Sequence, residues 1–183
     1  MKKQSIKAHL AEYSIAQKRT TTINHAFASA IAPADKFDES KLDAALRILE
    51  QDPNSDLRCV YCRLPAETWD HLAGLVENSE WRGYGHQIGN LVPCCRKCNS
   101  SKGSKDWKSY LRSIGLAESE FRLRTKLIDS YLEQYAVRVD PKRAMEILPT
   151  EWKRYAKIKG EILDLMKEAD IIAAQLRDAV KAK

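Results

Sequence analysis

The sequence has no long apolar run, no basic leader followed by an apolar core, no internal repeat and no low-complexity tract. A membrane-spanning helix needs about 20 consecutive apolar residues, and a secretory signal needs a shorter apolar core behind basic residues. Their absence predicts a cytoplasmic protein with no membrane partner. In that reducing compartment, closely spaced cysteines hold metal more often than they form disulfides.

Cysteine is also scarce, with five in the chain, but four of the five form two CxxC pairs, Cys59 with Cys62 and Cys95 with Cys98. A CxxC turn brings two sulfurs about one metal's width apart, and two such turns complete a tetrahedral zinc site with no open position. A thioredoxin-type redox protein usually has a single CxxC. We therefore predict a structural zinc site. Cys94 could replace Cys95 as a ligand, but only Cys95 has the CxxC spacing, so we interpret Cys94 as a small buried residue.

The segment between and just after the pairs, residues 67–103, predicts a strand, a loop, a second strand and a helix. The strands are expected at residues 68–72 and 90–93, with a glycine-containing loop between them. The helix is expected to start at Cys95 or Arg96. The predicted class is mostly α with a small ββα zinc finger, an α+β arrangement flanked by helical N- and C-terminal regions.

This segment resembles the HNH nuclease family, whose core is a ββα-metal finger. The resemblance covers about residues 57–108 and includes a CxxC pair on each side of the central segment. The residues that match are Cys59, Cys62, Asp70, His71, Asn90, Leu91, Val92, Pro93, Cys95, Cys98, Asn99, Lys102 and Gly103.

The resemblance implies a site that hydrolyses phosphodiester bonds. His71 would be the general base, since histidine can accept a proton from water near neutral pH. Asp70 and Asn99 would give oxygen ligands to a catalytic Mg²⁺ or Mn²⁺, and Asn90 would brace the loop that aims His71. Strand alternation alone would send Asp70 and His71 to opposite faces, so their placement in one cleft comes from the resemblance. The role of His86 is left open between a phosphate or metal contact and a solvated loop residue.

The charge balance predicts a polyanionic partner. The chain has 31 Lys and Arg against 25 Asp and Glu, a net charge of +6. Residues 96–112 hold six basic residues and one acid, directly after the predicted site. A solvated helix face explains most such runs, but this position favours phosphate binding. The predicted DNA contacts are Arg96, Lys97, Lys102, Lys105 and Lys108.

We predict three regions, an N-terminal helical region at 1–56, the nuclease finger at 57–108 and a C-terminal helical region at 109–183. In the first region, helical spacing predicts a helix at 5–18, a second beginning at the threonines of residues 20–22, and a third capped by Ser40.

In the last region, helices are expected at 106–113 and 118–135, followed by a long terminal helix from Thr150 to about Ala182. That helix carries an apolar heptad pattern from Tyr155 to Ala179. It could pack on its own domain, which we favour, or pair with a second copy to form a homodimer.

The sequence therefore predicts a metal-dependent DNA endonuclease of the HNH type. A zinc-finger protein that binds nucleic acid without cutting it is the alternative from another class. An HNH nuclease that acts on RNA or branched DNA is a further alternative.

Overall fold

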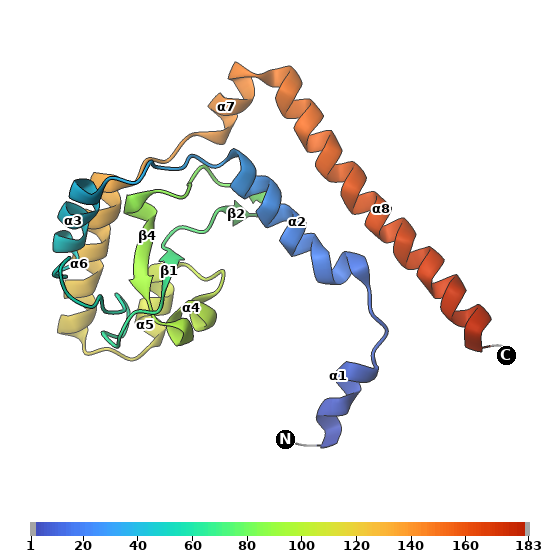
Figure 1. Cartoon of the computed structure of the whole chain (residues 1–183), viewed down its shortest axis with the longest axis horizontal. Helices are drawn as coiled ribbons and strands as arrows, with labels where there is room; N and C mark the ends of the chain where they lie inside the picture. The colour runs from blue at the N-terminus through green and yellow to red at the C-terminus, as the bar shows by residue number, and fades with distance from the viewer. Residues whose placement is uncertain (1–2, 182–183) are drawn as a thin grey trace. The chain divides into compact units, whose positions relative to one another are not determined.

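The computed structural model describes residues 3–181 (Figure 1). It is mostly helical with two small antiparallel sheets, which confirms the predicted class. Within the described range, no helix is both long and apolar enough to cross a membrane. The elements are η1 (Lys3–Ile6), α1 (Lys7–Leu10), α2 (Ile15–Ile31), α3 (Glu39–Ile48), β1 (Thr68–His71), β2 (Val76–Glu77), β3 (Glu80–Trp81), η2 (Ile88–Asn90), β4 (Leu91–Cys94), α4 (Arg96–Lys102), α5 (Trp107–Ser113), α6 (Glu118–Tyr135), α7 (Pro141–Ile147) and α8 (Pro149–Lys181).

The chain forms two compact units. One comprises residues 28–144, and the other joins residues 3–27 to residues 145–181. The predicted finger at 57–108 lies wholly inside the first unit, together with α3 and α6, which the sequence assigned to flanking regions.

The centre of the 28–144 unit is the antiparallel pair of β1 and β4, in which Asp70 lies opposite Val92 and His71 opposite Leu91. The predicted strand, loop, strand and helix follow in that order. β4 starts one residue later than expected because residues 88–90 turn as the 3-10 helix η2. Helix α4 then begins directly after β4, with the Cys95 sulfur accepting a hydrogen bond from the Cys98 N–H as its N-cap.

The loop between β1 and β4 contains a hairpin that the sequence pattern did not indicate. Strands β2 and β3 pair antiparallel across a two-residue turn. Asn78 and Ser79 both have positive φ in this turn, at 51° and 67°. Positive φ at both central residues is typical of the tight turns that match strand twist, and Asn-Ser is a weaker signal for it than Asn-Gly.

Helix α6 packs against η2 and β4. Its predicted bounds, 118–135, are those observed. Ile128 and Tyr131 are fully buried, and the Tyr131 hydroxyl donates to the carbonyls of Ile88 and Leu91. Because these carbonyls belong to η2 and β4, α6 fixes the strand that precedes the second cysteine pair.

The helix starts in the N-terminal region differ from the predictions. The predicted helix at 5–18 is interrupted, because α1 ends at Leu10 and α2 starts at Ile15, where Ser14 accepts a hydrogen bond from the Gln17 N–H. Helix α3 is capped by Asp38, whose carboxylate accepts from the Lys41 N–H, so the prediction of Ser40 as its cap was wrong. In both cases a side-chain acceptor earlier in the chain starts the helix sooner.

In the second unit, α8 packs antiparallel to α2. The Phe27 and Tyr155 rings lie 4.9 Å apart, and the Asp170 carboxylate accepts hydrogen bonds from Ser14 Oγ and from two N–H groups at the start of α2. Pro149 opens α8, one residue before the predicted start, as suits a residue that lacks an N–H. The predicted end at Ala182 lies outside the described residues.

The apolar residues of the predicted heptad in α8 differ in their burial. Tyr155, Ile158 and Ile162 are half-buried, whereas Leu165 and Leu176 are 62% and 64% exposed. A straight helix has 3.6 residues per turn, so a strict seven-residue repeat drifts away from one packing face.

Candidate functional site

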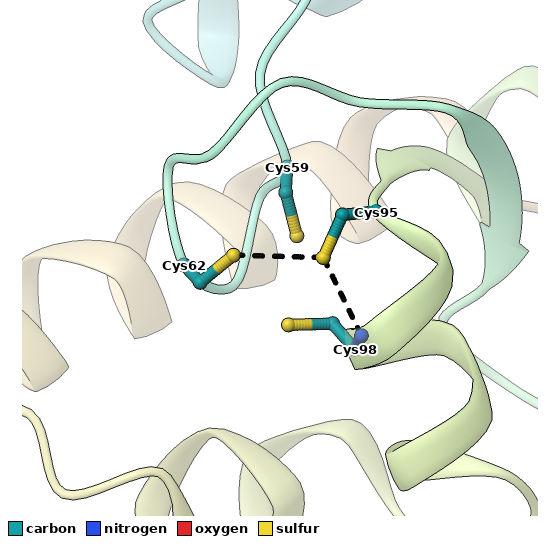
Figure 2. A group of neighbouring side chains, drawn as sticks. All are labelled: Cys59, Cys62, Cys95 and Cys98. Carbon is teal, nitrogen blue, oxygen red and sulfur yellow. Dashed lines mark hydrogen bonds between the residues drawn. The ribbon is translucent and has the colours of Figure 1, made fainter.

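The two CxxC pairs meet in a single cluster. Cys59 and Cys62 lie on a loop before β1, and Cys95 and Cys98 lie at the start of α4, with all four side chains directed toward a common centre (Figure 2). Their ligand atoms lie within 4.8 Å of one another, and the Cys62 and Cys95 sulfurs are 3.6 Å apart. Tetrahedral zinc with Zn–S bonds of about 2.3 Å places its sulfurs roughly 3.8 Å apart. The cluster therefore fits a structural metal such as zinc.

Local backbone hydrogen bonds build both halves of the cluster. The Cys59 carbonyl accepts from the Arg63 N–H at 2.9 Å, and the Cys59 N–H donates to the Leu64 carbonyl at 2.7 Å. In the second half, the Asn99 N–H donates to the Cys95 carbonyl at 3.0 Å. Three of the four cysteines are buried and Cys62 is half-buried. A buried set of four sulfurs has no position for a substrate water, so the site is structural rather than catalytic.

Cys94 lies beside the cluster rather than in it. It is fully buried, as predicted; its sulfur accepts from the Cys59 thiol at 3.9 Å, and its own thiol donates to the Cys95 carbonyl at 3.3 Å. The hydrogen bond with Cys94 lowers the pKa of Cys59 to about 4, whereas burial raises the pKa of Cys62 and of Cys98. Metal-free protein therefore keeps protons on some of these thiols, and zinc binding must release them.

Asp70 is buried and already bonded on both carboxylate oxygens. Oδ2 accepts from the Tyr61 hydroxyl at 2.9 Å, and Lys102 Nζ lies 3.3 Å from Oδ1 and 3.2 Å from Oδ2. The same ammonium group donates to the His71 carbonyl at 2.8 Å. Burial raises the pKa of Asp70, and the Lys102 charge opposes that shift.

The position of Lys102 corrects its predicted role. The sequence placed it among the surface contacts to DNA, but its side chain is 3% exposed and points inward to Asp70. A buried carboxylate requires a neutralising partner. Lys102 lies on α4, one helical turn after Asn99, and its side chain reaches the Asp70 carboxylate. Oxygen donors on Asp70 and Asn99 have the right chemistry for Mg²⁺ or Mn²⁺. With both Asp70 oxygens engaged, however, this arrangement does not fit an open divalent-ion site.

The side chain of His71 contacts a different group from that of Asp70. His71 Nε2 lies 3.1 Å from His86 Nδ1, so one of these nitrogens donates a proton to the other. The two neighbouring residues of β1 thus follow strand alternation, with Asp70 buried and His71 half-buried. The structure joins Asp70 to Lys102 and to Tyr61, and His71 to His86.

Asn90 links the segments that carry the two histidines. Its Oδ1 accepts from the Ala73 N–H at 2.8 Å, and its Nδ2 donates to the carbonyls of Ala73 and Gly85, each at 3.0 Å. Ala73 comes two residues after His71, and Gly85 directly precedes His86. Asn90 is fully buried, so its amide satisfies backbone groups that water cannot reach.

The remaining predicted basic contacts are at the surface. Arg96, Lys97, Lys105 and Lys108 are exposed. Two of them have acidic partners, Arg96 with Glu67 at 3.8 Å and Lys108 with Asp129 at 3.1 Å. These exposed pairs are weak, so a phosphate can compete for the same cations.

A cavity of about 140 Å³ lies between the loop that follows His71 and the end of α4. Its lining residues include Ala73, Arg82, Tyr84, Lys102 and Lys105. The lining of the cavity is therefore partly basic and includes two aromatic residues, Tyr84 and Trp107.

Sequence reasoning missed Tyr61 as a partner of Asp70. This residue lies inside the first CxxC, where spacing identifies only the cysteines, and its hydroxyl reaches β1 through the folded core. His86 was noticed, but only the fold places its ring against His71.

Comparisons of the chain with family models, with curated proteins and with solved structures gave no match.

Proposed function

We propose that this protein is an endonuclease that hydrolyses DNA phosphodiester bonds with His71 as the general base. The observation that carries the proposal is the union of β1, β4 and α4 around a four-cysteine cluster, with His71 on β1 and a braced loop beside it. This is the ββα arrangement that the resemblance to HNH nucleases implies.

The residues present can each perform a step of that reaction. Imidazole can take a proton from the attacking water at neutral pH. The exposed Arg96, Lys97 and Lys105 can bind the phosphate backbone, which carries most of the affinity in complexes with DNA. With zinc bound, the four-cysteine cluster would hold the start of α4 close to β1. This arrangement would keep Lys102 near His71. The resemblance implies a requirement for Mg²⁺ or Mn²⁺, and Asp70 could bind such an ion only after Lys102 releases its carboxylate.

A direct assay tests this function. Purified full-length protein, loaded with zinc, is incubated with supercoiled plasmid, single-stranded DNA, branched DNA and RNA, with Mg²⁺, Mn²⁺ or a chelator selective for these ions. We expect plasmid nicking or linearisation that depends on the divalent ion.

The matched variants are His71→Ala and His25→Ala, the latter at an exposed position on α2. Loss of a general base lowers the rate by about 10²- to 10⁴-fold, so His71→Ala should lose cleavage at that scale while His25→Ala does not. Equal cleavage by His71→Ala and wild-type protein would show that the base lies elsewhere.

One observation favours a second function, a zinc-stabilised protein that binds nucleic acid without cutting it. Lys102 occupies both oxygens of Asp70, where a catalytic ion would otherwise bind. Salt-dependent binding to DNA with no cleavage under any metal condition would support this function. Cleavage of RNA or branched DNA alone would instead change the substrate and keep the chemistry.

We also propose that double-strand cleavage uses a homodimer. One site attacks one strand at a time, and a two-fold dimer presents one site to each antiparallel strand. Leu165, Ile172 and Leu176 are exposed on α8 and could form its seam. A chain that stays monomeric in light scattering and yet linearises plasmid in one concerted step would contradict this proposal.

A further inference from the structure

We infer that His86 is a positioning residue for His71, through the hydrogen bond between His86 Nδ1 and His71 Nε2. This inference rests on the proposed function, since it assigns His86 a part in the same reaction. Neither the spacing of the motif nor the family resemblance gives His86 that part.

The first observation is the geometry of the ring pair. The two nitrogens are 3.1 Å apart, and the rings meet edge to face, with centroids 5.1 Å apart and an interplanar angle of 69°. Stacked rings would not bring two ring nitrogens into line. This arrangement is a directed hydrogen bond that holds one proton between the two imidazoles.

The second observation is that the backbone of His86 is held on both sides. Its N–H donates to the Pro33 carbonyl at 2.9 Å, and its carbonyl accepts from the Asp35 N–H at 3.1 Å, so Ala34 and His86 form a parallel bridge. The approach is so close that a Cβ on Gly85 would lie 1.9 Å from the Pro33 carbonyl oxygen. Only glycine permits this contact.

The segment that holds His86 is itself anchored. The Asp35 carboxylate accepts from the Ile88 N–H at 3.1 Å and from Lys41 Nζ at 2.9 Å. Asp35 therefore ties Ile88, two residues after His86, to Lys41 of α3. A loop held at this many points keeps its side chain in one place.

The third observation is the shared brace. The Asn90 amide bonds Ala73 after the first histidine and Gly85 before the second. One buried side chain thus sets the separation of the two segments and so of the two rings.

This geometry matters for a general base because the two nitrogens of imidazole are not equivalent. A hydrogen bond at one nitrogen decides which tautomer is present and how the ring is turned. When His71 Nε2 donates in this contact, His71 Nδ1 carries no proton and can accept one from water, and the contact fixes the direction of that nitrogen. A mobile ring would spend part of its time in the wrong tautomer or rotamer.

Three substitutions at one position test the inference in the full-length, zinc-loaded protein. His86→Leu removes the hydrogen bond. His86→Asn keeps a polar atom bonded to Cγ, in the place of Nδ1. His86→Gln moves its amide one bond further out, toward the place of Nε2. His25→Ala serves as the remote control, and zinc content and thermal midpoint are measured for every variant.

We expect His86→Leu to lower kcat for plasmid cleavage by about 10- to 100-fold, the usual loss when a partner that orients a functional side chain is removed. KM should stay within about two-fold, because DNA binding is not altered. His86→Asn should recover most of that loss and His86→Gln should not. Wild-type kcat in His86→Leu, or equal kcat in the Asn and Gln variants, would overturn the inference.

A second readout separates this inference from the proposed function. Nitrogen-15 NMR of the histidine rings reports the tautomer of His71 directly. We expect one tautomer in wild-type protein and in His86→Asn, and a mixture in His86→Leu. If wild-type protein cuts no nucleic acid, the proposed function fails and the ring spectra still decide whether the pair exists. An unchanged His71 spectrum in His86→Leu would refute the pairing, whatever the activity.

Discussion

The ion pair between Lys102 and Asp70 yields a sharp prediction about stability. The two side chains are 3% and 7% exposed, and the charged atoms are 3.2 Å apart. Lys102→Met keeps much of the side-chain volume but removes the positive charge. The Asp70 carboxylate would then stay buried with the hydrogen bond from the Tyr61 hydroxyl but without the neutralising charge of Lys102.

The expected cost is large. Removing one partner of a buried pair destabilises a protein by about 3–5 kcal/mol, because the other charge stays buried without compensation. The lost hydrogen bond to the His71 carbonyl, about 1 kcal/mol, is part of that figure. The double variant that combines Lys102→Met with Asp70→Asn removes both charges. We therefore expect it to cost less than the two single changes added together, with a coupling of roughly 2 kcal/mol.

The sign of the pH dependence follows from burial. The pKa of Asp70 is raised in the folded protein, so the folded state holds that proton more tightly than the unfolded state. Lys102→Met strengthens this effect, because the opposing positive charge is gone. The deficit of the variant relative to wild type should therefore shrink as the pH falls, because protonation removes the buried charge of Asp70.

Urea denaturation of zinc-loaded protein, followed by circular dichroism, measures both effects. A matched surface variant, Lys97→Met, removes an exposed lysine from the same helix and should change stability by less than about 0.5 kcal/mol. A loss of under about 1 kcal/mol in Lys102→Met, independent of pH, would refute the claim that this lysine neutralises a buried carboxylate.

Three further predictions concern the cluster and the backbone. Chelation of zinc should unfold the 28–144 unit reversibly. Zinc should also dissociate more readily as the pH falls, because burial raises the pKa of Cys62 and of Cys98 and protons compete with the metal. A zinc-release indicator combined with circular dichroism measures both effects, and a metal-free unit that stays folded would contradict the prediction. Asp170→Ala should speed amide exchange at the start of α2, and in wild-type protein the same contact should weaken as the pH falls below about 3.8, because its hydrogen bonds lower the pKa of Asp170 beneath that ordinary value. Gly85→Ala should destabilise the folded protein by roughly 1–3 kcal/mol, because there is no space for the added Cβ. Gly160→Ala, in open space within α8, should instead stabilise the folded protein by about 0.4–1 kcal/mol. Calorimetry of the two variants measures both changes.

Short-range patterns in the chain determined much of this structure. The two CxxC pairs predict the metal cluster because each CxxC turn places its own two sulfurs close together. The tertiary fold is needed only to bring the two turns into contact. The bounds of α6 follow from the break at Gly115 and from an apolar stripe at helical spacing. The change from β4 to α4 follows from the short extended segment 91–94 and from Cys95, which caps the helix that comes next. In each case the interactions that decide the outcome lie within a few residues.

The tertiary structure alone decided which polar groups meet. Lys102 looks like a surface cation in the sequence, but it turns inward because Asp70, 32 residues earlier, is buried opposite it. His86 pairs with His71 because the chain near residue 33 holds its backbone at that distance. Asp170 caps α2 from more than 150 residues away. A buried charge or an unpaired N–H requires a partner, and the sequence shows that requirement, but which side chain meets it depends on segments brought together only when the chain folds.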